Sequence, residues 1–169
     1  MKKVIKCIAV FTCVILFISC TKEYSAQRII PKLGWEFTAE TKDFSGSFYD
    51  VYDTTVTGVG YLLVIVGTTP TTDSVLVAQV HFPGSSIVPG TYSTSSVGNG
   101  FYYSDIRDTS NPLIIYSAES RSVGASTQLV ITSYDPLTGI VTGTFSGTAL
   151  NASNLPVSIT EGKFKAKVR

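Results

Sequence analysis

The sequence predicts an all-β, antiparallel domain, built as a meander-like β-sandwich or a flattened β-barrel and preceded by a cleaved signal peptide. After the first twenty residues, no long stretch has the 3.6-residue period of an amphipathic helix. Short runs of β-branched and aromatic residues recur instead, separated by clusters of glycine, proline, asparagine and aspartate. In the last third of the chain, apolar and hydroxyl residues alternate, as in strands with one buried face.

The first nineteen residues are expected to form a lipoprotein signal peptide. Lys2, Lys3 and Lys6 supply positive charge, and residues 7–18 form an apolar run of twelve residues. A membrane-spanning helix needs roughly 20 residues, so a secretory signal is favoured over a transmembrane anchor. The remaining polar segment, residues 20–33, is expected to be a flexible tether to a single domain at residues 34–169.

Cys20 closes the apolar run and is the expected site of lipid attachment. Ordinary signal peptidases need small residues at −1 and −3, and Phe17 is too large for −3. The stretch Phe17-Ile18-Ser19-Cys20 resembles a bacterial lipobox, with Ser19 at −1 and the cysteine at +1, although the pattern prefers leucine at −3 and a small residue at −2. The resemblance implies that Cys20 is acylated, with palmitate as the acyl group to test. Two or more acyl chains give a durable anchor.

The expected location is the cell envelope, with the outer membrane favoured over the inner. In lipoproteins of this kind an acidic residue straight after the cysteine favours inner-membrane retention, and Thr21 is not acidic. The periplasmic face and the cell surface both stay open. Since Cys7 and Cys13 lie in the signal peptide, the mature chain has no pair of cysteines for a disulfide.

The charge distribution argues against nucleic-acid binding. Removal of the signal leaves ten Lys and Arg residues against twelve Asp and Glu residues, whereas nucleic-acid-binding domains are strongly basic. Between Lys42 and Lys163 the only cations are Arg107 and Arg121, so the centre is acidic and the two ends are basic. The predicted strands are residues 35–40, 47–53, 56–67, 74–82, 90–94, 101–104, 113–118, 126–134, 139–150 and 156–168.

The clearest predicted pair is the hairpin formed by residues 126–134 and 139–150. Pro136 suits the second position of a type I turn, and Gly139 suits the left-handed residue after it. Gly143 and Gly147 lack side chains on the inward face, so we expect a large neighbour to fill each gap or the strand to bend there.

The last strand changes the phase of its alternation, which predicts a β-bulge. Val157 and Ile159 are apolar at odd positions, whereas Phe164 and later apolar residues are at even positions. We expect the extra residue at Glu161-Gly162, where glycine would supply the positive φ. The cations Lys163, Lys165, Lys167 and Arg169 then share the outer face, where they could contact anionic lipid or polysaccharide or simply prevent edge-to-edge aggregation.

The end of the chain, T-G-x-V-T-G-T-F-S-G-T-A followed by V-S-I-T-E-G-K-F, resembles a family of small Gram-negative envelope lipoproteins of unknown function. Gly90-Thr91-Tyr92 and the opening Trp35-x-Phe37-Thr38-Ala39 share this resemblance. It implies an all-β domain, lipocalin-like or sandwich, on a lipid anchor, and it implies no activity.

No motif for catalysis, a metal or a cofactor is found, so no catalytic, cofactor-binding or metal-binding residue is expected and the chain is not expected to be an enzyme. His81 is the only histidine, and it more simply packs within a strand; with no free cysteine, a His/Cys metal site is excluded by count. An oxygen-only calcium site from Asp43, Asp105 or Asp108 stays possible. A glycosidase would need a carboxylate pair, for which Glu36 with Glu40 and Asp50 with Asp53 are the candidates.

Aromatic residues offer a possible ligand platform. Tyr92, Phe101, Tyr102 and Tyr103 lie on either side of a loop rich in serine and glycine and could stack against a sugar ring or line the mouth of an apolar site. The sequence therefore predicts a lipid-anchored envelope protein that binds a partner or serves a structural role. The alternatives are a lipocalin-like carrier of an apolar small molecule and a glycan-binding or glycan-processing accessory protein. The oligomeric state stays open.

Overall fold

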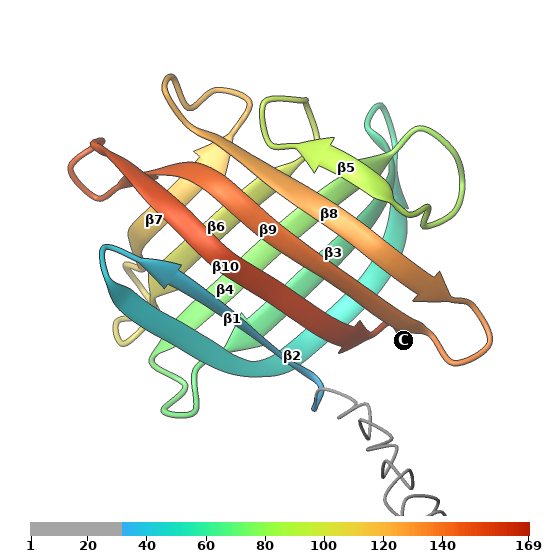
Figure 1. Cartoon of the computed structure of the whole chain (residues 1–169), viewed down its shortest axis with the longest axis horizontal. Helices are drawn as coiled ribbons and strands as arrows, with labels where there is room; N and C mark the ends of the chain where they lie inside the picture. Colours follow the sequence, from blue (N-terminus) through green and yellow to red (C-terminus); the bar gives the residue numbers. More distant parts are fainter. Residues whose placement is uncertain (1–31) are drawn as a thin grey trace, which may run out of the picture. The chain divides into compact units, whose positions relative to one another are not determined.

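The computed structural model describes residues 32–169, which form a closed, eight-stranded antiparallel β-barrel without helices (Figure 1). The all-β fold class is confirmed, and the barrel is the form adopted. The strands are β1 (Gly34–Ala39), β2 (Lys42–Val56), β3 (Gly60–Thr68), β4 (Ser74–Phe82), β5 (Gly90–Ser93), β6 (Gly100–Asp105), β7 (Leu113–Glu119), β8 (Ser126–Asp135), β9 (Ile140–Asn151) and β10 (Pro156–Lys167).

The barrel is a meander in which neighbouring strands of the chain mostly pair with one another. The closed ring runs β1-β2-β3-β4-β6-β7-β9-β10 and returns to β1, because β10 pairs with both β9 and β1. Strands β7 and β8 share one edge of β9, and β5 adds to the other edge of β8. In Figure 1, β5, β8, β9 and β10 cross the near side and β3, β4 and β6 lie behind them.

The predicted strand positions are confirmed, except around β2. This strand begins at Lys42, earlier than the predicted residue 47, and it therefore includes Gly46. A Cβ at Gly46 would lie 2.6 Å from Cζ2 of Trp35 and 2.0 Å from the Thr68 carbonyl oxygen, so the glycine is required by close packing. The prediction that one strand runs from residue 56 to 67 is wrong. Gly58 and Gly60, with φ of 80° and 118°, form a turn there instead.

The hairpin of β8 and β9 is confirmed in both its pairing and its turn. The amide of Gly139 donates to the Asp135 carbonyl oxygen at 2.8 Å, and Gly139 has a φ of 70°. Phe164 fills the space beside Gly143, as expected, because a Cβ there would lie 2.4 Å from the ring. At Gly147 the close neighbour is backbone instead, with the Ser126 carbonyl oxygen 2.3 Å from such a Cβ.

The β-bulge in β10 is confirmed at the predicted residues. Ile159 pairs with Gly147 and Gly162 pairs with Phe145, so β10 has one residue more than β9 in this interval. The prediction that Gly162 supplies the positive φ is wrong, because the residue with positive φ is Glu161, at 54°. Gly162 is needed for space: a Cβ there would lie 2.2 Å from the Phe145 carbonyl oxygen and 2.5 Å from its ring.

Aromatic side chains fill the waist of the barrel from wall to wall. Phe37 in β1 and Phe101 in β6 come from opposite sides of the ring of strands, and their ring centroids are 5.7 Å apart. Phe145 in β9 lies 5.8 Å from Phe37 and 5.3 Å from Phe101. All three are at most 2% exposed. The interior at this level is therefore a packed core.

The barrel closes through a short seam between β7 and β9. Only Tyr116 with Asn151 and Ser117 with Leu150 pair across it. Glu40, in the turn between β1 and β2, accepts hydrogen bonds from the Tyr116 hydroxyl at 3.1 Å and from the Asn151 side-chain amide at 3.5 Å. The β1–β2 hairpin thus reinforces the seam from one end of the barrel.

Candidate functional site

The structure does not bring the four predicted aromatic residues together on the surface. Phe101 and Tyr103 point into the barrel and are 0% and 3% exposed, because side chains alternate between the two faces of β6. Tyr102 lies on the outer face, where its hydroxyl donates to Glu119 at 2.9 Å. Tyr92 packs against Phe82 and donates to the Val88 carbonyl oxygen. A platform containing all four rings is therefore not formed.

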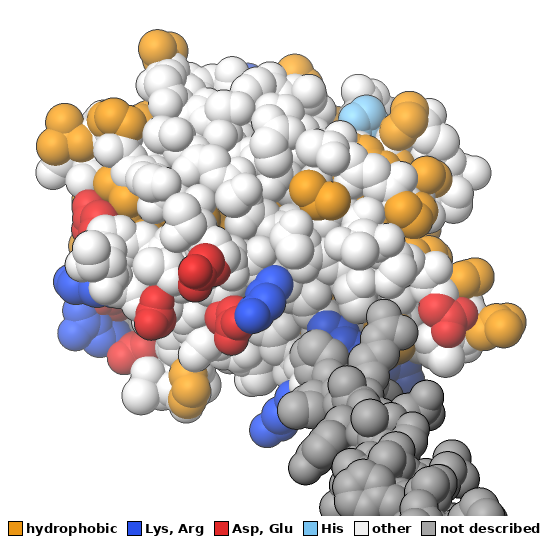
Figure 2. All heavy atoms as spheres, viewed as in Figure 1, with side chains coloured by type: hydrophobic (Ala, Val, Ile, Leu, Met, Phe, Trp, Pro, Cys, Tyr) orange, Lys and Arg blue, Asp and Glu red, His pale blue; other side chains and the backbone are white. Residues whose placement is uncertain are grey.

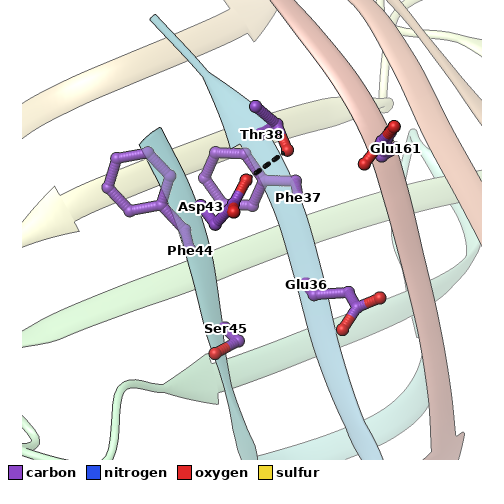
Figure 3. A pocket seen from close by; sticks show the side chains of 7 residues that line it. All are labelled: Glu36, Phe37, Thr38, Asp43, Phe44, Ser45 and Glu161. Atoms are coloured by element: carbon purple, nitrogen blue, oxygen red, sulfur yellow. Dashed lines mark hydrogen bonds between the residues drawn. The ribbon is translucent and has the colours of Figure 1, made fainter. Parts of the chain in front are cut away.

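A hollow of about 210 Å³ lies beside the bulge of β10, where β1, β2 and β10 run next to one another. It combines carboxylates, hydroxyls and aromatic residues, and Figure 3 shows how their side chains lie. The lining residues are Glu36, Phe37, Thr38, Asp43, Phe44, Ser45 and Glu161.

Alternation along the strands positions these side chains. In β1, Glu36 and Thr38 face outward while Phe37 faces the core, and Phe37 stacks on its cross-strand partner Phe44 at 4.8 Å. The bulge shifts the register of β10, since Phe37 of β1 stands opposite the two residues Glu161 and Gly162. The left-handed backbone of Glu161 therefore places this carboxylate beside β1 rather than in a regular alternation.

The charges around the hollow are partly paired. Glu36 binds Lys163, which raises the pKa of that lysine above its ordinary value through the hydrogen bond and the ion pair. Asp43 accepts a hydrogen bond from the Thr38 hydroxyl at 2.7 Å. Acidic and basic side chains gather on the lower part of the face shown in Figure 2, whereas the upper part is mostly uncharged. The hollow thus offers hydrogen-bond acceptors and hydroxyl groups next to aromatic carbon.

Some residues of this hollow can be recognised in the sequence, but their proximity in the fold cannot. The bulge at residues 161–162 was predicted, and Glu36 and Asp43 were considered for other roles. What was missing is the pairing of β1 with β10, which brings the two ends of the domain side by side. A phase change in the last strand near a carboxylate was the one available signal.

The carboxylates proposed for a glycosidase each bind a different partner. Glu36 binds Lys163 and Glu40 binds Tyr116, while Asp50 accepts a hydrogen bond from Arg169 at 2.7 Å. Asp53 accepts a hydrogen bond from the Tyr61 hydroxyl. Each of these four carboxylates therefore has a contact of its own within the fold.

Three tyrosine–carboxylate pairs have a marked effect on the titration of the phenols. Burial is the first cause in each case, and a hydrogen bond to a carboxylate is the second. Together they raise the pKa of Tyr61, Tyr102 and Tyr116 from 10.0 to about 12. The accepting residues are Asp53, Glu119 and Glu40. The three phenols therefore stay protonated at neutral pH and donate hydrogen bonds to carboxylate side chains in the folded state.

His81 packs between two turns at one end of the barrel. A Cβ at Gly60 would lie 2.6 Å from its Nε2 atom, and one at Gly98 would lie 2.9 Å from its Cβ. Its backbone amide donates to Asn99 Oδ1 at 2.6 Å. Within residues 32–169, no three His, Cys, Asp or Glu side chains are grouped so as to hold a metal ion. Asp105, one of the calcium candidates, binds Arg107 instead.

The expected signal peptide, Cys20 and most of the tether lie outside the described residues. No helix within the described part of the chain has both the length and the apolar character required to cross a membrane. Comparison with known proteins found no match to any family model, curated protein or solved structure.

Proposed function

We propose that the chain is a lipid-anchored protein of the cell envelope that acts by binding at the outer surface of its barrel, without catalysing a reaction. The anchor is Cys20, and the outer membrane is the favoured location because Thr21 is not acidic. Membership of the family of small Gram-negative lipoproteins is part of the same proposal, supported by the sequence resemblance and by a barrel compatible with a lipocalin-like fold.

The filled waist of the barrel is the observation that favours surface binding over the carrier function. Carrier barrels hold their ligand in an interior space, and typical ligand cavities measure roughly 300–1,000 Å³. Here the contact between Phe37 and Phe101 spans the interior. An apolar ligand at this level would have to displace packed aromatic rings, at a cost of several kcal/mol.

The hollow beside the β10 bulge supports a polyhydroxyl ligand such as a glycan. Glu36, Asp43 and Glu161 present carboxylate oxygens, which accept hydrogen bonds from sugar hydroxyls. The volume of about 210 Å³ suits one sugar ring better than a longer segment, so we propose that the hollow takes a terminal or branching residue.

Metabolic labelling tests the anchor. Cells that express the full chain with labelled palmitate should incorporate the label into the wild type and not into Cys20→Ala, because the thiol carries the acyl group. A Cys13→Ala variant is the matched control and should be labelled normally. Equal labelling of Cys20→Ala and the wild type would disprove the anchor.

A glycan screen with residues 21–169 tests the surface site. Among the described residues the hydrophobic core runs from Trp35 to Val168, so this fragment contains all ten strands of the barrel. Asp43→Asn and Glu161→Gln should weaken binding of a recognised glycan by about tenfold, the value of one hydrogen bond to a charged group. Tyr102→Ala, on the outer face of β6, is the control. A glycan whose binding depends on Tyr102 and not on the hollow would place the site elsewhere.

A further inference from the structure

The first and last residues of the barrel form a surface together with the tip of the β8–β9 hairpin. Gly34, the first residue of β1, pairs with Lys165, and Lys167 pairs with Ile140 at the start of β9. The amide of Val168 donates to the Gly139 carbonyl oxygen at 2.9 Å. We call this the terminal surface and define it by Leu33, Leu137, Lys165 and Lys167. In Figure 1 the start of β1, the end of the chain and the β8–β9 hairpin follow one another from the lower centre to the right of the barrel.

This surface combines exposed apolar side chains with cations. Leu137 at the hairpin tip is 95% exposed and Leu33 is 42% exposed. Lys165 and Lys167 project from the outer face of β10, and the ion pairs formed between residues 32 and 169 include neither of them. An exposed leucine is solvated unfavourably in water, and its transfer to a lipid interface is favourable. Neighbouring lysines add attraction to anionic lipids.

Two carboxylates adjoin the terminal surface: Asp135, across from Ile140, and Asp50, the partner of Arg169. Asp135 contributes one negative charge, because hydrogen bonds from the Thr138 hydroxyl at 2.7 Å and the Leu137 amide at 3.0 Å lower its pKa and keep it ionised. Asp50 binds Arg169, so this pair adds no net charge. Lys165 and Lys167 outnumber Asp135, so the surface keeps a net positive charge that complements an anionic partner.

We propose that the terminal surface lies against the anionic headgroups of the membrane that carries the lipid anchor, with Leu137 inserted among them. The inference rests on the proposed anchor, because it uses the length of chain between Cys20 and Leu33. Thirteen residues span at most about 45 Å when fully extended. Leu33 is the last residue of that tether. The terminal surface therefore contains the point at which the tether joins the barrel.

The opposite end of β8 provides a matched comparison. Val123 is 93% exposed, close to the exposure of Leu137, but its neighbouring cation Arg121 stands two residues from the acidic Glu119 in the sequence. Ten residues of β8 separate the two loops, which corresponds to roughly 30 Å. The two exposed apolar residues therefore differ in their neighbouring charge and in their distance from the start of the barrel.

Sedimentation with lipid vesicles tests the proposal on the unlipidated fragment 21–169. Vesicles of phosphatidylcholine with phosphatidylglycerol should bind the fragment at low salt, and vesicles of phosphatidylcholine alone should not. Each of Lys165→Glu and Lys167→Glu should weaken binding at least about fivefold, the fold-change for the loss of one cation near an anionic surface. Leu137→Ser should weaken it several-fold, and Val123→Ser should leave it unchanged.

The possible outcomes separate this proposal from the anchor. The membrane-facing orientation would be overturned if Val123→Ser and Leu137→Ser lost vesicle binding equally, or if neither lysine variant lost vesicle binding. Either result would count even if Cys20 takes up palmitate. Selective loss in the terminal-surface variants would support the orientation even if the labelling of Cys20 fails. Binding to neutral vesicles that is insensitive to both lysine variants would also overturn it.

Discussion

Glu161 and Gly162 show how two adjacent residues divide the demands of one bulge. Glu161 adopts the left-handed conformation, which costs a residue with a Cβ about 1–2 kcal/mol. Gly162 has no such φ, yet its missing side chain leaves room for the carbonyl group and ring of Phe145. Backbone strain is therefore located at Glu161 and the need for space at Gly162. Substitutions at the two residues should change stability in opposite directions.

We predict that Gly162→Ala destabilises the barrel by about 1–3 kcal/mol, because the added methyl group would overlap Phe145. Glu161→Gly should stabilise it slightly, by less than about 1 kcal/mol, since relief of the left-handed cost is partly offset by the greater chain entropy of glycine. Urea unfolding of residues 21–169 measures both. Destabilisation by Glu161→Gly greater than that by Gly162→Ala would contradict this division of roles.

At the level of the strands, the seam between β7 and β9 is the shortest contact in the ring. It has two residue pairs, whereas β10 pairs with β9 along almost its whole length. Glu40 compensates by joining Tyr116 and Asn151 from the neighbouring hairpin. Local opening of a barrel starts where few contacts hold the strands, so we expect opening to begin here.

Tyr116→Phe tests the contribution of this contact because it removes one hydroxyl and keeps the buried ring. The loss of a hydrogen bond to a carboxylate should reduce the free energy of unfolding by about 1–2 kcal/mol. Amide hydrogen exchange of Leu150 and Ser117 should accelerate more than that of Ile65 in β3. Tyr49→Phe is the control, since Tyr49 is 81% exposed. A uniform change in exchange across all strands would argue against a local seam.

For the molecule as a whole, the tyrosine–carboxylate pairs predict a limit to stability at alkaline pH. Tyr61, Tyr102 and Tyr116 have a pKa of about 12 in the fold, against an ordinary value of 10.0. Between these values the folded chain holds more protons than the unfolded chain, so stability falls as pH rises. The three tyrosine–carboxylate pairs contribute fully to the free energy of unfolding below about pH 10, and this contribution is lost as the pH approaches about 12.

Thermal unfolding at pH 8, 9.5 and 11 measures this dependence. The midpoint should change little between pH 8 and 9.5 and should fall clearly by pH 11. Tyr102→Phe removes one pair on the outer face, so its midpoint should fall less over the upper interval than that of the wild type. An equal fall in both proteins would assign the alkaline loss of stability to other groups.

Local patterns predicted the strands and their turns with few errors, because alternation and turn chemistry depend on neighbours in the chain. The turn at Gly139 and the bulge at Glu161-Gly162 are examples. The four aromatic residues Tyr92, Phe101, Tyr102 and Tyr103 do not share one surface, for a reason contained in the same rule. Adjacent residues of a strand face opposite ways, so Phe101 and Tyr103 entered the core while Tyr102 stayed outside.

Local patterns along the chain are enough to predict the all-β class and the hairpin of β8 and β9, and they lead to the expectation of a lipid anchor at Cys20. The closure of the sheet, the aromatic rings that fill its waist and the pairing of β1 with β10 are visible only in the folded molecule. These features depend on contacts between residues far apart in the chain, whose pairing no local pattern specifies. The hollow and the terminal surface exist because barrel closure brings the first and last strands together.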